Sequence, residues 1–129
     1  MNSKFYISLE AARLLKEKGY NEEYINHYDE NGEIIIPYYE HEYDKLYPAP
    51  TKAEAIDWLD SKGIMISVVY DNLGIIGKKH YRSIINTLDK DGSESDLPIY
   101  LPSYYGDIRH YPTRLEAEEA AIIKALEIL

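Results

Sequence analysis

Apolar residues recur with helical spacing in three segments of the chain, and the first of these covers residues 9–18. Ser8 stands directly before it, and a serine at this position accepts a hydrogen bond from the free N–H groups of the first turn. Gly19 follows, and glycine readily takes the left-handed conformation that closes a helix. Tyr20 then stands where a hydrophobic residue packs back onto Leu15. We therefore predict a helix over 9–18.

The other two helical segments both begin at a threonine that is followed three residues later by a glutamate. Thr51 and Glu54 form one such T-x-x-E pattern, and Thr113 and Glu116 form the other. In this capping box each side chain bonds to the backbone N–H of the other residue. We expect the earlier helix to end at Gly63 and the later one to run to the last residue. Their expected apolar faces consist of Ala55, Ile56, Trp58 and Leu59, and of Leu115, Ile122, Ile123, Leu126 and Leu129.

Two hairpin patterns lie between the helices. The first joins residues 24–28 to 33–39 through Asn31-Gly32, a strong tight-turn signal, and Pro37 makes its second strand an edge strand. The second joins residues 64–70 to a strand within 78–88. The order α-ββα-ββα predicts an α+β fold in which helices pack on an antiparallel sheet of two hairpins.

Length predicts a single domain, because 129 residues match one ordinary globular core. Residues 20–63 and 64–129 each read as ββα, and each has a Tyr-Pro pair shortly before its capping box. Two interpretations are open. Either the halves are a pseudo-repeat that arose by duplication, or the same short sequence pattern independently ends an extended segment and starts a capped helix in each half.

The formal net charge is −9, and residues 21–60 alone sum to −9. Such a field repels phosphate backbones, so direct nucleic-acid binding is not expected. The candidate basic face, Lys78, Lys79, His80 and Arg82, is small.

Cysteine is absent, which excludes disulfides, thiolate metal ligands and thiol nucleophiles. No apolar run approaches the roughly 20 residues that cross a bilayer. The first residues show no signal-peptide core. We expect a cytoplasmic protein that does not enter a membrane.

Tyrosine is the most unusual feature of the composition, with 14 Tyr against one Phe and one Trp. Seven lie within residues 20–47 and four within 100–111, both among carboxylates. Tyrosine rings can edge a thin core with their hydroxyls in water, or they can form an acidic aromatic surface that binds a protein. The candidate binding residues on the second interpretation are Tyr28, Tyr38, Tyr39, Tyr43, Tyr104 and Tyr105.

Catalytic and metal-binding motifs are not recognisable. The four histidines lack zinc-site spacing, residues 89–96 depart from the EF-hand pattern, and residues 74–79 lack the phosphate-loop sequence. There is no G-x-S-x-G elbow. We therefore predict no catalytic residue, no metal ligand and no cofactor. An enzyme would need a pocket with convergent groups, such as His110 with Asp107 or His27 with Asp29.

Residues 7–20, the turn at 28–32 and residues 49–59 resemble a set of small uncharacterised proteins of gut Bacteroidetes and of their phages and prophages. The resemblance rests on helix caps, a turn and a helix that bears a tryptophan. It implies a mobile-element context and brings no activity or functional residue with it.

Three functions follow as hypotheses. The leading one is a non-enzymatic phage or mobile-element accessory protein that binds a protein partner through an acidic, Tyr-rich surface. The second is an acidic mimic of nucleic acid that inhibits a host nuclease or DNA-binding protein. The third is a small enzyme with a pocket of Tyr, His and carboxylate groups. Because an exposed hairpin edge invites strand pairing, a homodimer is also expected to be accessible.

Overall fold

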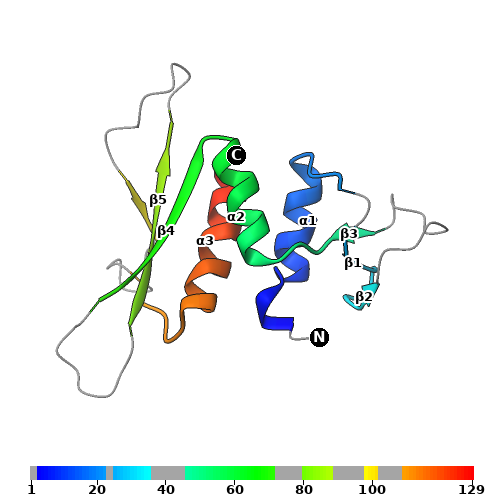
Figure 1. Ribbon diagram of the computed structural model, residues 1–129, viewed down its shortest axis with the longest axis horizontal. Helices are drawn as coiled ribbons and strands as arrows, with labels where there is room; N and C mark the ends of the chain where they lie inside the picture. The colour runs from blue at the N-terminus through cyan, green and yellow to red at the C-terminus, as the bar shows by residue number, and fades with distance from the viewer. Residues whose placement is uncertain (1–2, 23–24, 36–45, 72–79, 89–97, 102–108) are drawn as a thin grey trace.

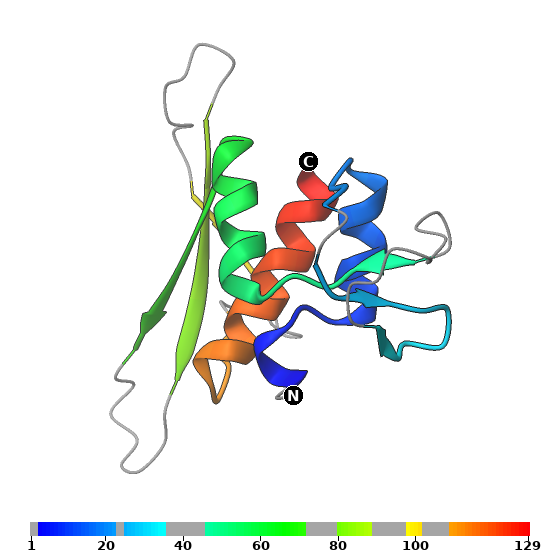
Figure 2. The same ribbon diagram turned by 45° about the vertical axis from the view of Figure 1, so that its right-hand side comes forward.

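The fold consists of α-helices and two small antiparallel sheets (Figures 1 and 2). The computed structural model describes residues 3–22, 25–35, 46–71, 80–88, 98–101 and 109–129. After a 3-10 turn at Ser3–Phe5, the elements are α1 (Leu9–Glu17), β1 (His27–Tyr28), β2 (Ile34–Ile35), β3 (Tyr47–Pro48), α2 (Lys52–Ser61), β4 (Ile64–Tyr70), β5 (Tyr81–Thr87), β6 (Ile99–Tyr100) and α3 (Arg114–Ile128). The predicted α+β class is confirmed.

Helix α1 starts and ends as its sequence predicts. The Ser8 side chain accepts a 3.2 Å hydrogen bond from the backbone N–H of Ala11. At the other end Gly19 has a φ of +96°, and the N–H of Tyr20 bonds to the carbonyl of Leu15 at 3.2 Å. This glycine closure satisfies carbonyls that the last turn would otherwise leave free.

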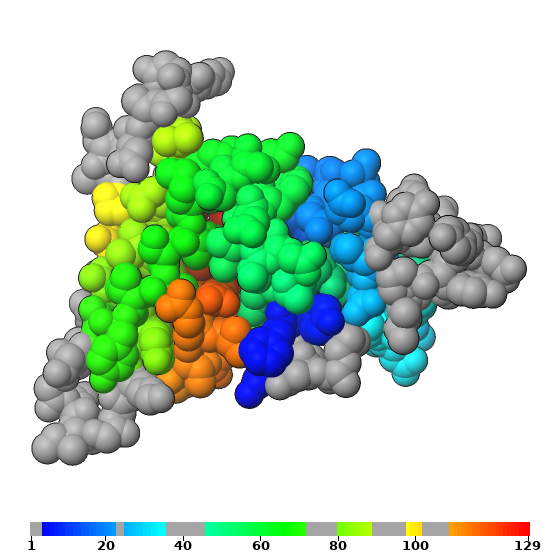
Figure 3. Space-filling model, viewed as in Figure 1, coloured from blue at the N-terminus to red at the C-terminus, as the bar shows by residue number. Residues whose placement is uncertain are grey.

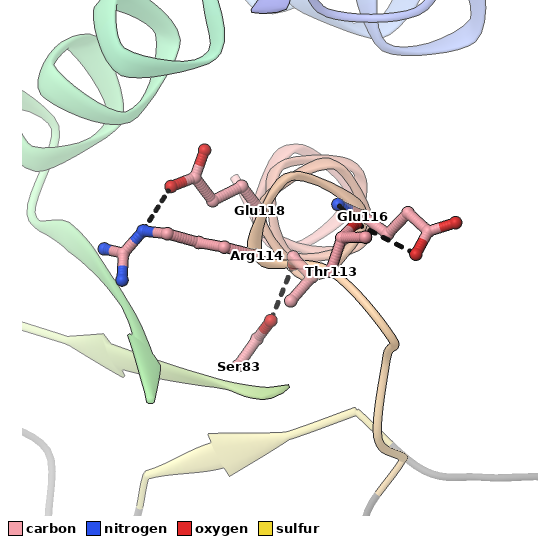
Figure 4. Close-up of polar contacts among 6 residues, drawn as sticks. Ser83, Thr113, Arg114, Glu116 and Glu118 are labelled. Carbon is pink, nitrogen blue, oxygen red and sulfur yellow. Dashed lines mark hydrogen bonds and ion pairs between the residues drawn. The ribbon is translucent and has the colours of Figure 1, made fainter. Parts of the chain in front are cut away.

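Both threonines cap their helices, and the predicted reciprocal capping box is complete at α2. In α2 the Glu54 N–H donates to Thr51 Oγ1 at 3.2 Å, and the Thr51 N–H donates back to Glu54 Oε1 at 3.1 Å. In α3 the Glu116 N–H donates to Thr113 Oγ1 at 3.2 Å, and the Thr113 hydroxyl donates to the Glu116 carboxylate at 3.0 Å (Figure 4). Gly63, with a φ of +86°, follows α2 as predicted.

The first hairpin forms the sheet β2-β1-β3. Its turn closes through a 3.0 Å bond from the Gly32 N–H to the Asp29 carbonyl, and Gly32 has a φ of +83°. β3 was not predicted from the sequence, and it pairs with the other side of β1, with Tyr28 opposite Tyr47. The flanking residues 23–24 and 36–45 lie outside the described residues.

The second hairpin forms the sheet β4-β5-β6. β4 and β5 pair without interruption from Ile64 opposite Thr87 to Tyr70 opposite Tyr81. β6 was not predicted, and it pairs with β5 on the side away from β4. Tyr111 forms an isolated bridge with Tyr81.

The two hairpins therefore belong to separate sheets rather than to one. The helices lie between these sheets in both views (Figures 1 and 2), so the hairpin edges cannot meet. The strand orders also differ, because the first strand is central in one sheet and the second strand is central in the other. The pseudo-repeat of residues 20–63 and 64–129 stays a prediction.

The core surrounds α3, which lies between α1 and the second sheet (Figures 1 and 2). Alanines at 117, 121 and 125 of α3 are fully buried, and small side chains let neighbouring elements approach closely. Ile122 and Leu126 are also fully buried, whereas Leu129 is 38% exposed. The fully buried side chains contributed by the other elements include Ile7, Leu15, Leu59 and Ile85.

Candidate functional site

Tyr28 is one of the six tyrosines predicted to bind a partner, and it is a core residue. Its side chain is 7% exposed, and its hydroxyl donates a 2.6 Å hydrogen bond to the carbonyl of Ile7. Burial raises the pKa of this phenol, and Glu119 adds to the effect. The ring belongs to the same buried hydrophobic cluster as Ile7 and Ala49. Tyr28 therefore does not contribute to a binding surface. The other five predicted residues lie outside the described part of the chain: Tyr38, Tyr39, Tyr43, Tyr104 and Tyr105.

The solvent face of α2 is acidic. Glu54, Asp57 and Asp60 follow one another at intervals of three residues, which places them along one side of the helix, and all three are exposed. We call this set, together with the exposed Glu22, the acidic α2 face. These four residues belong to the 21–60 segment whose negative charge stands out in the sequence.

An aromatic pair adjoins the acidic α2 face. The rings of Tyr20 and Trp58 meet edge to face, with centroids 5.5 Å apart. Trp58 is partly exposed, and Lys62 Nζ lies 5.3 Å from the centroid of its ring. Burial raises the pKa of Tyr20 to about 12, and the charges of Glu54 and Glu22 contribute in the same direction. Carboxylates from two segments of the chain therefore both raise the pKa of the Tyr20 phenol.

A polar cluster, which we call the Asp71 cluster, joins β4, β5 and the segment before α3. One oxygen of Asp71, Oδ2, lies 2.6 Å from Arg82 Nε and 3.0 Å from His110 Nε2. All three side chains are about one quarter exposed. The ring of His80 meets the ring of His110 edge to face at 6.0 Å. The cluster comprises Asp71, His80, Arg82 and His110.

The chemistry of the Asp71 cluster favours a structural role. Asp71 orients the His110 imidazole, as a carboxylate does in an acid–base pair. Arg82 binds the same carboxylate oxygen, however, and its guanidinium also lies 5.6 Å from the ring centroid of Tyr100. The contacts therefore join three segments of chain and balance one another's charge. Neither Asp71 nor its contact with His110 was predicted from the sequence.

The histidine pairs proposed from the sequence fall elsewhere. His110 pairs with Asp71, and Asp107 lies outside the described residues. His27 is buried, and its Nδ1 donates to the Ile25 carbonyl at 2.8 Å, because a carbonyl can only accept. The Asp29 carboxylate accepts two backbone N–H groups of its own turn.

The basic face predicted at residues 78–82 is only partly described. Arg82 is paired with Asp71, which neutralises its charge locally, and Lys78 and Lys79 lie outside the described residues. Within the described ranges, no three His, Asp or Glu side chains are grouped so that they could hold a metal ion.

Comparison with protein-family models, with curated proteins and with solved structures gives no match for this chain. The resemblance carried by residues 7–20, 28–32 and 49–59 therefore stays a prediction. Among the described helices, none is both long enough and apolar enough to cross a membrane.

Proposed function

We propose that this chain is a non-enzymatic accessory protein that binds a basic partner protein through the acidic α2 face. The observation that carries the proposal is the placement of exposed Glu54, Asp57 and Asp60 beside the partly exposed Trp58. The phage or mobile-element origin rests on the sequence resemblance alone. A chain without cysteine suits a reducing compartment, and the proposal places it in the cytoplasm.

The two components of this surface make different contributions to binding. Carboxylates in water attract a positively charged partner over about 8–10 Å and mainly raise the association rate. Aromatic rings supply contact area at small entropic cost, and Trp and Tyr are enriched among residues that dominate binding energy. An acidic face beside a Trp therefore suits a partner that offers Lys or Arg next to an apolar contact.

The Tyr-rich segments extend the same proposal to residues 38–43. Tyr38, Tyr39 and Tyr43 belong to the most acidic part of the sequence, and we propose that they enlarge the binding surface. Replacing all three by Ala should weaken capture of the partner and leave the thermal unfolding temperature unchanged. A large fall in that temperature would instead place the three rings in the core.

A charge-matched pair of triple variants tests the acidic α2 face. The test variant is Glu54→Gln, Asp57→Asn and Asp60→Asn, in which the amide oxygen introduced at position 54 can still accept the capping bond of Thr51. The control is Glu10→Gln, Glu17→Gln and Glu127→Gln, which removes three exposed carboxylates from α1 and α3. Both variants lose three negative charges, so a difference between them reports position and not net charge.

The measurement is capture of host proteins by the immobilised chain at low and at high salt. We expect a partner that binds at low salt to be lost with the test variant and retained with the control. No salt-sensitive partner, or equal loss with both variants, would overturn the proposal. Capture of a nuclease or a DNA-binding protein that duplex DNA displaces would identify the nucleic-acid mimic instead.

A further inference from the structure

Strand β4 presents a free hydrogen-bonding edge. The Asp71 N–H bonds to the His80 carbonyl at 2.8 Å, and the Leu88 N–H bonds to the Gly63 carbonyl at 2.9 Å. Residue pairs along two antiparallel strands alternate between pairs that exchange backbone hydrogen bonds and pairs that do not. Because Gly63 and Asp71 both bond to residues that flank β5, the odd-numbered residues of β4 are the ones that bond to β5. The even-numbered residues direct their N–H and C=O groups away from β5, and no described backbone group pairs with them. These residues are Ile64, Ile66, Val68 and Tyr70.

The sequence of this edge has none of the residues that usually protect a strand from further pairing. Natural edge strands carry charges, proline or bulges. The sequence of β4 is IMISVVY, which contains no charge, proline or glycine, and its register with β5 is continuous. By contrast, the edge strand β3 of the first sheet contains Pro48. Figure 3 shows the green atoms of β4 at the surface of the molecule, beside those of α2.

We propose that β4 pairs antiparallel with β4 of a second copy of this chain, so that the two second sheets become one six-stranded sheet. A twofold axis at Ser67 puts Ile66 opposite Val68 of the second copy, and Ile64 opposite its Tyr70. This register uses the backbone groups of all four outward-directed residues. A register displaced to either side along the strand leaves some of them unpaired.

The side chains of β4 are self-complementary in this register. On the face toward the helices, Ile64, Ile66, Val68 and Tyr70 meet one another across the new junction, and Tyr70, 54% exposed in one copy, gains an apolar neighbour. On the opposite face Met65 meets Val69, and Ser67 meets Ser67 across the axis. Like charges opposite each other would destabilise the pairing, and this register places none opposite each other. In this antiparallel register apolar residues lie opposite apolar residues, and serine lies opposite serine. An uncharged strand of this kind fits a second copy of itself better than it fits a charged peptide.

Charge elsewhere on the molecule separates this inference from the proposed function. Each copy carries a net charge of −9, so the two copies repel and the dimer should strengthen as salt rises. Binding of a basic partner should weaken under the same change. The two proposals can therefore fail independently.

Sedimentation equilibrium of the full chain tests the inference. We expect the wild-type protein at high concentration and high salt to have twice the 15.0 kDa mass of one chain. Val68→Pro should be monomeric, because proline removes an N–H at the junction without removing a bond to β5. Circular dichroism of each variant shows whether it is folded.

A charge swap at Ser67 gives a second test that does not depend on proline. Ser67 is exposed, so lysine or glutamate fits there without entering the core. Ser67→Lys and Ser67→Glu should each raise the dimer dissociation constant by about fivefold or more, and mixing the two should restore a dimer of one copy of each. Asn86→Lys, on β5 and away from the junction, is the matched control and should dimerise as the wild type does. A wild-type mass of 15.0 kDa at every concentration, or a folded Val68→Pro variant that still dimerises, would overturn the proposal.

Discussion

Ser83 on β5 donates a 2.6 Å hydrogen bond from its Oγ to the carbonyl oxygen of Ala117 on α3 (Figure 4). Ser83 is 1% exposed and Ala117 is fully buried, so the contact lies inside the core. A buried hydroxyl without a partner would be costly, and here it finds one on the first turns of the helix that covers the sheet. The bond fixes how α3 lies against β5.

We predict that Ser83→Ala lowers the free energy of unfolding by about 1 kcal/mol, because a buried hydrogen bond is lost while little volume changes. Urea denaturation followed by circular dichroism measures this. Ser61→Ala is the control, because the Ser61 hydroxyl bonds to the Trp58 carbonyl at an exposed position, and it should change stability by less than about 0.5 kcal/mol. Equal losses in the two variants would contradict the role assigned to Ser83.

Tyr28→Phe tests whether this tyrosine belongs to the core. Removing the hydroxyl leaves the Ile7 carbonyl without its 2.6 Å donor, and the expected loss of stability is about 1–2 kcal/mol. Partner capture should be unchanged once the experiment is run below the unfolding temperature. A variant with wild-type stability and weakened capture would return Tyr28 to the binding surface.

The capping box of α2 should be worth about 1 kcal/mol, so Thr51→Ala should lower the free energy of unfolding by roughly that amount. The reason is that the Glu54 N–H loses its acceptor, and the Glu54 carboxylate loses the 2.8 Å hydrogen bond that the Thr51 hydroxyl donates to it. Thr51→Ser retains a hydroxyl and should behave nearly as the wild type. Thermal unfolding of the three proteins at one pH decides the matter.

Stability should fall at alkaline pH because of Tyr20. Its pKa is raised from 10.0 to about 12 in the folded protein, so above pH 10 the unfolded chain loses this proton while the folded chain keeps it. Ionisation then favours unfolding, and the contribution present below pH 10 is lost progressively up to about pH 12. Burial raises the pKa of Tyr28 and Tyr111 as well, which steepens the same trend.

Urea unfolding midpoints measured across this alkaline range show whether stability falls or rises with pH. Tyr20→Phe removes one ionisable group and should make the decline of stability with pH shallower. A stability that rises above pH 10 would contradict the assignment.

The helix ends could be predicted because each depends on residues close together in the chain. Ser8, Thr51 and Thr113 each accept a bond from a backbone N–H three residues ahead, and Gly19 closes its helix within the same turn. The turn at Gly32 is equally local. Such contacts join residues within one turn of chain, so their positions do not depend on which distant segment packs against the helix.

The candidate sites depended on contacts between distant residues. Asp71 and His110 are 39 positions apart, and no periodicity links them. β3 and β6 are short, and each exists because a neighbouring strand offers an edge. The α2 carboxylates and Trp58 could be placed on one helix from the sequence, but the contact between Trp58 and Tyr20 joins residues that are far apart in the chain.

The burial of the tyrosines could not be predicted from the sequence. The tyrosine ring is apolar and its hydroxyl is polar, so the same residue suits a core edge or a wet interface. The sequence by itself determined the α+β class, the helix ends and the uneven acidity, since these follow from short-range bonds and composition. Only the tertiary structure decided that Tyr28 is buried, that the hairpins form two sheets and that β4 is an edge strand of the described sheet. These are outcomes of which surfaces meet, and burial against a distant segment is not encoded by any short stretch of chain.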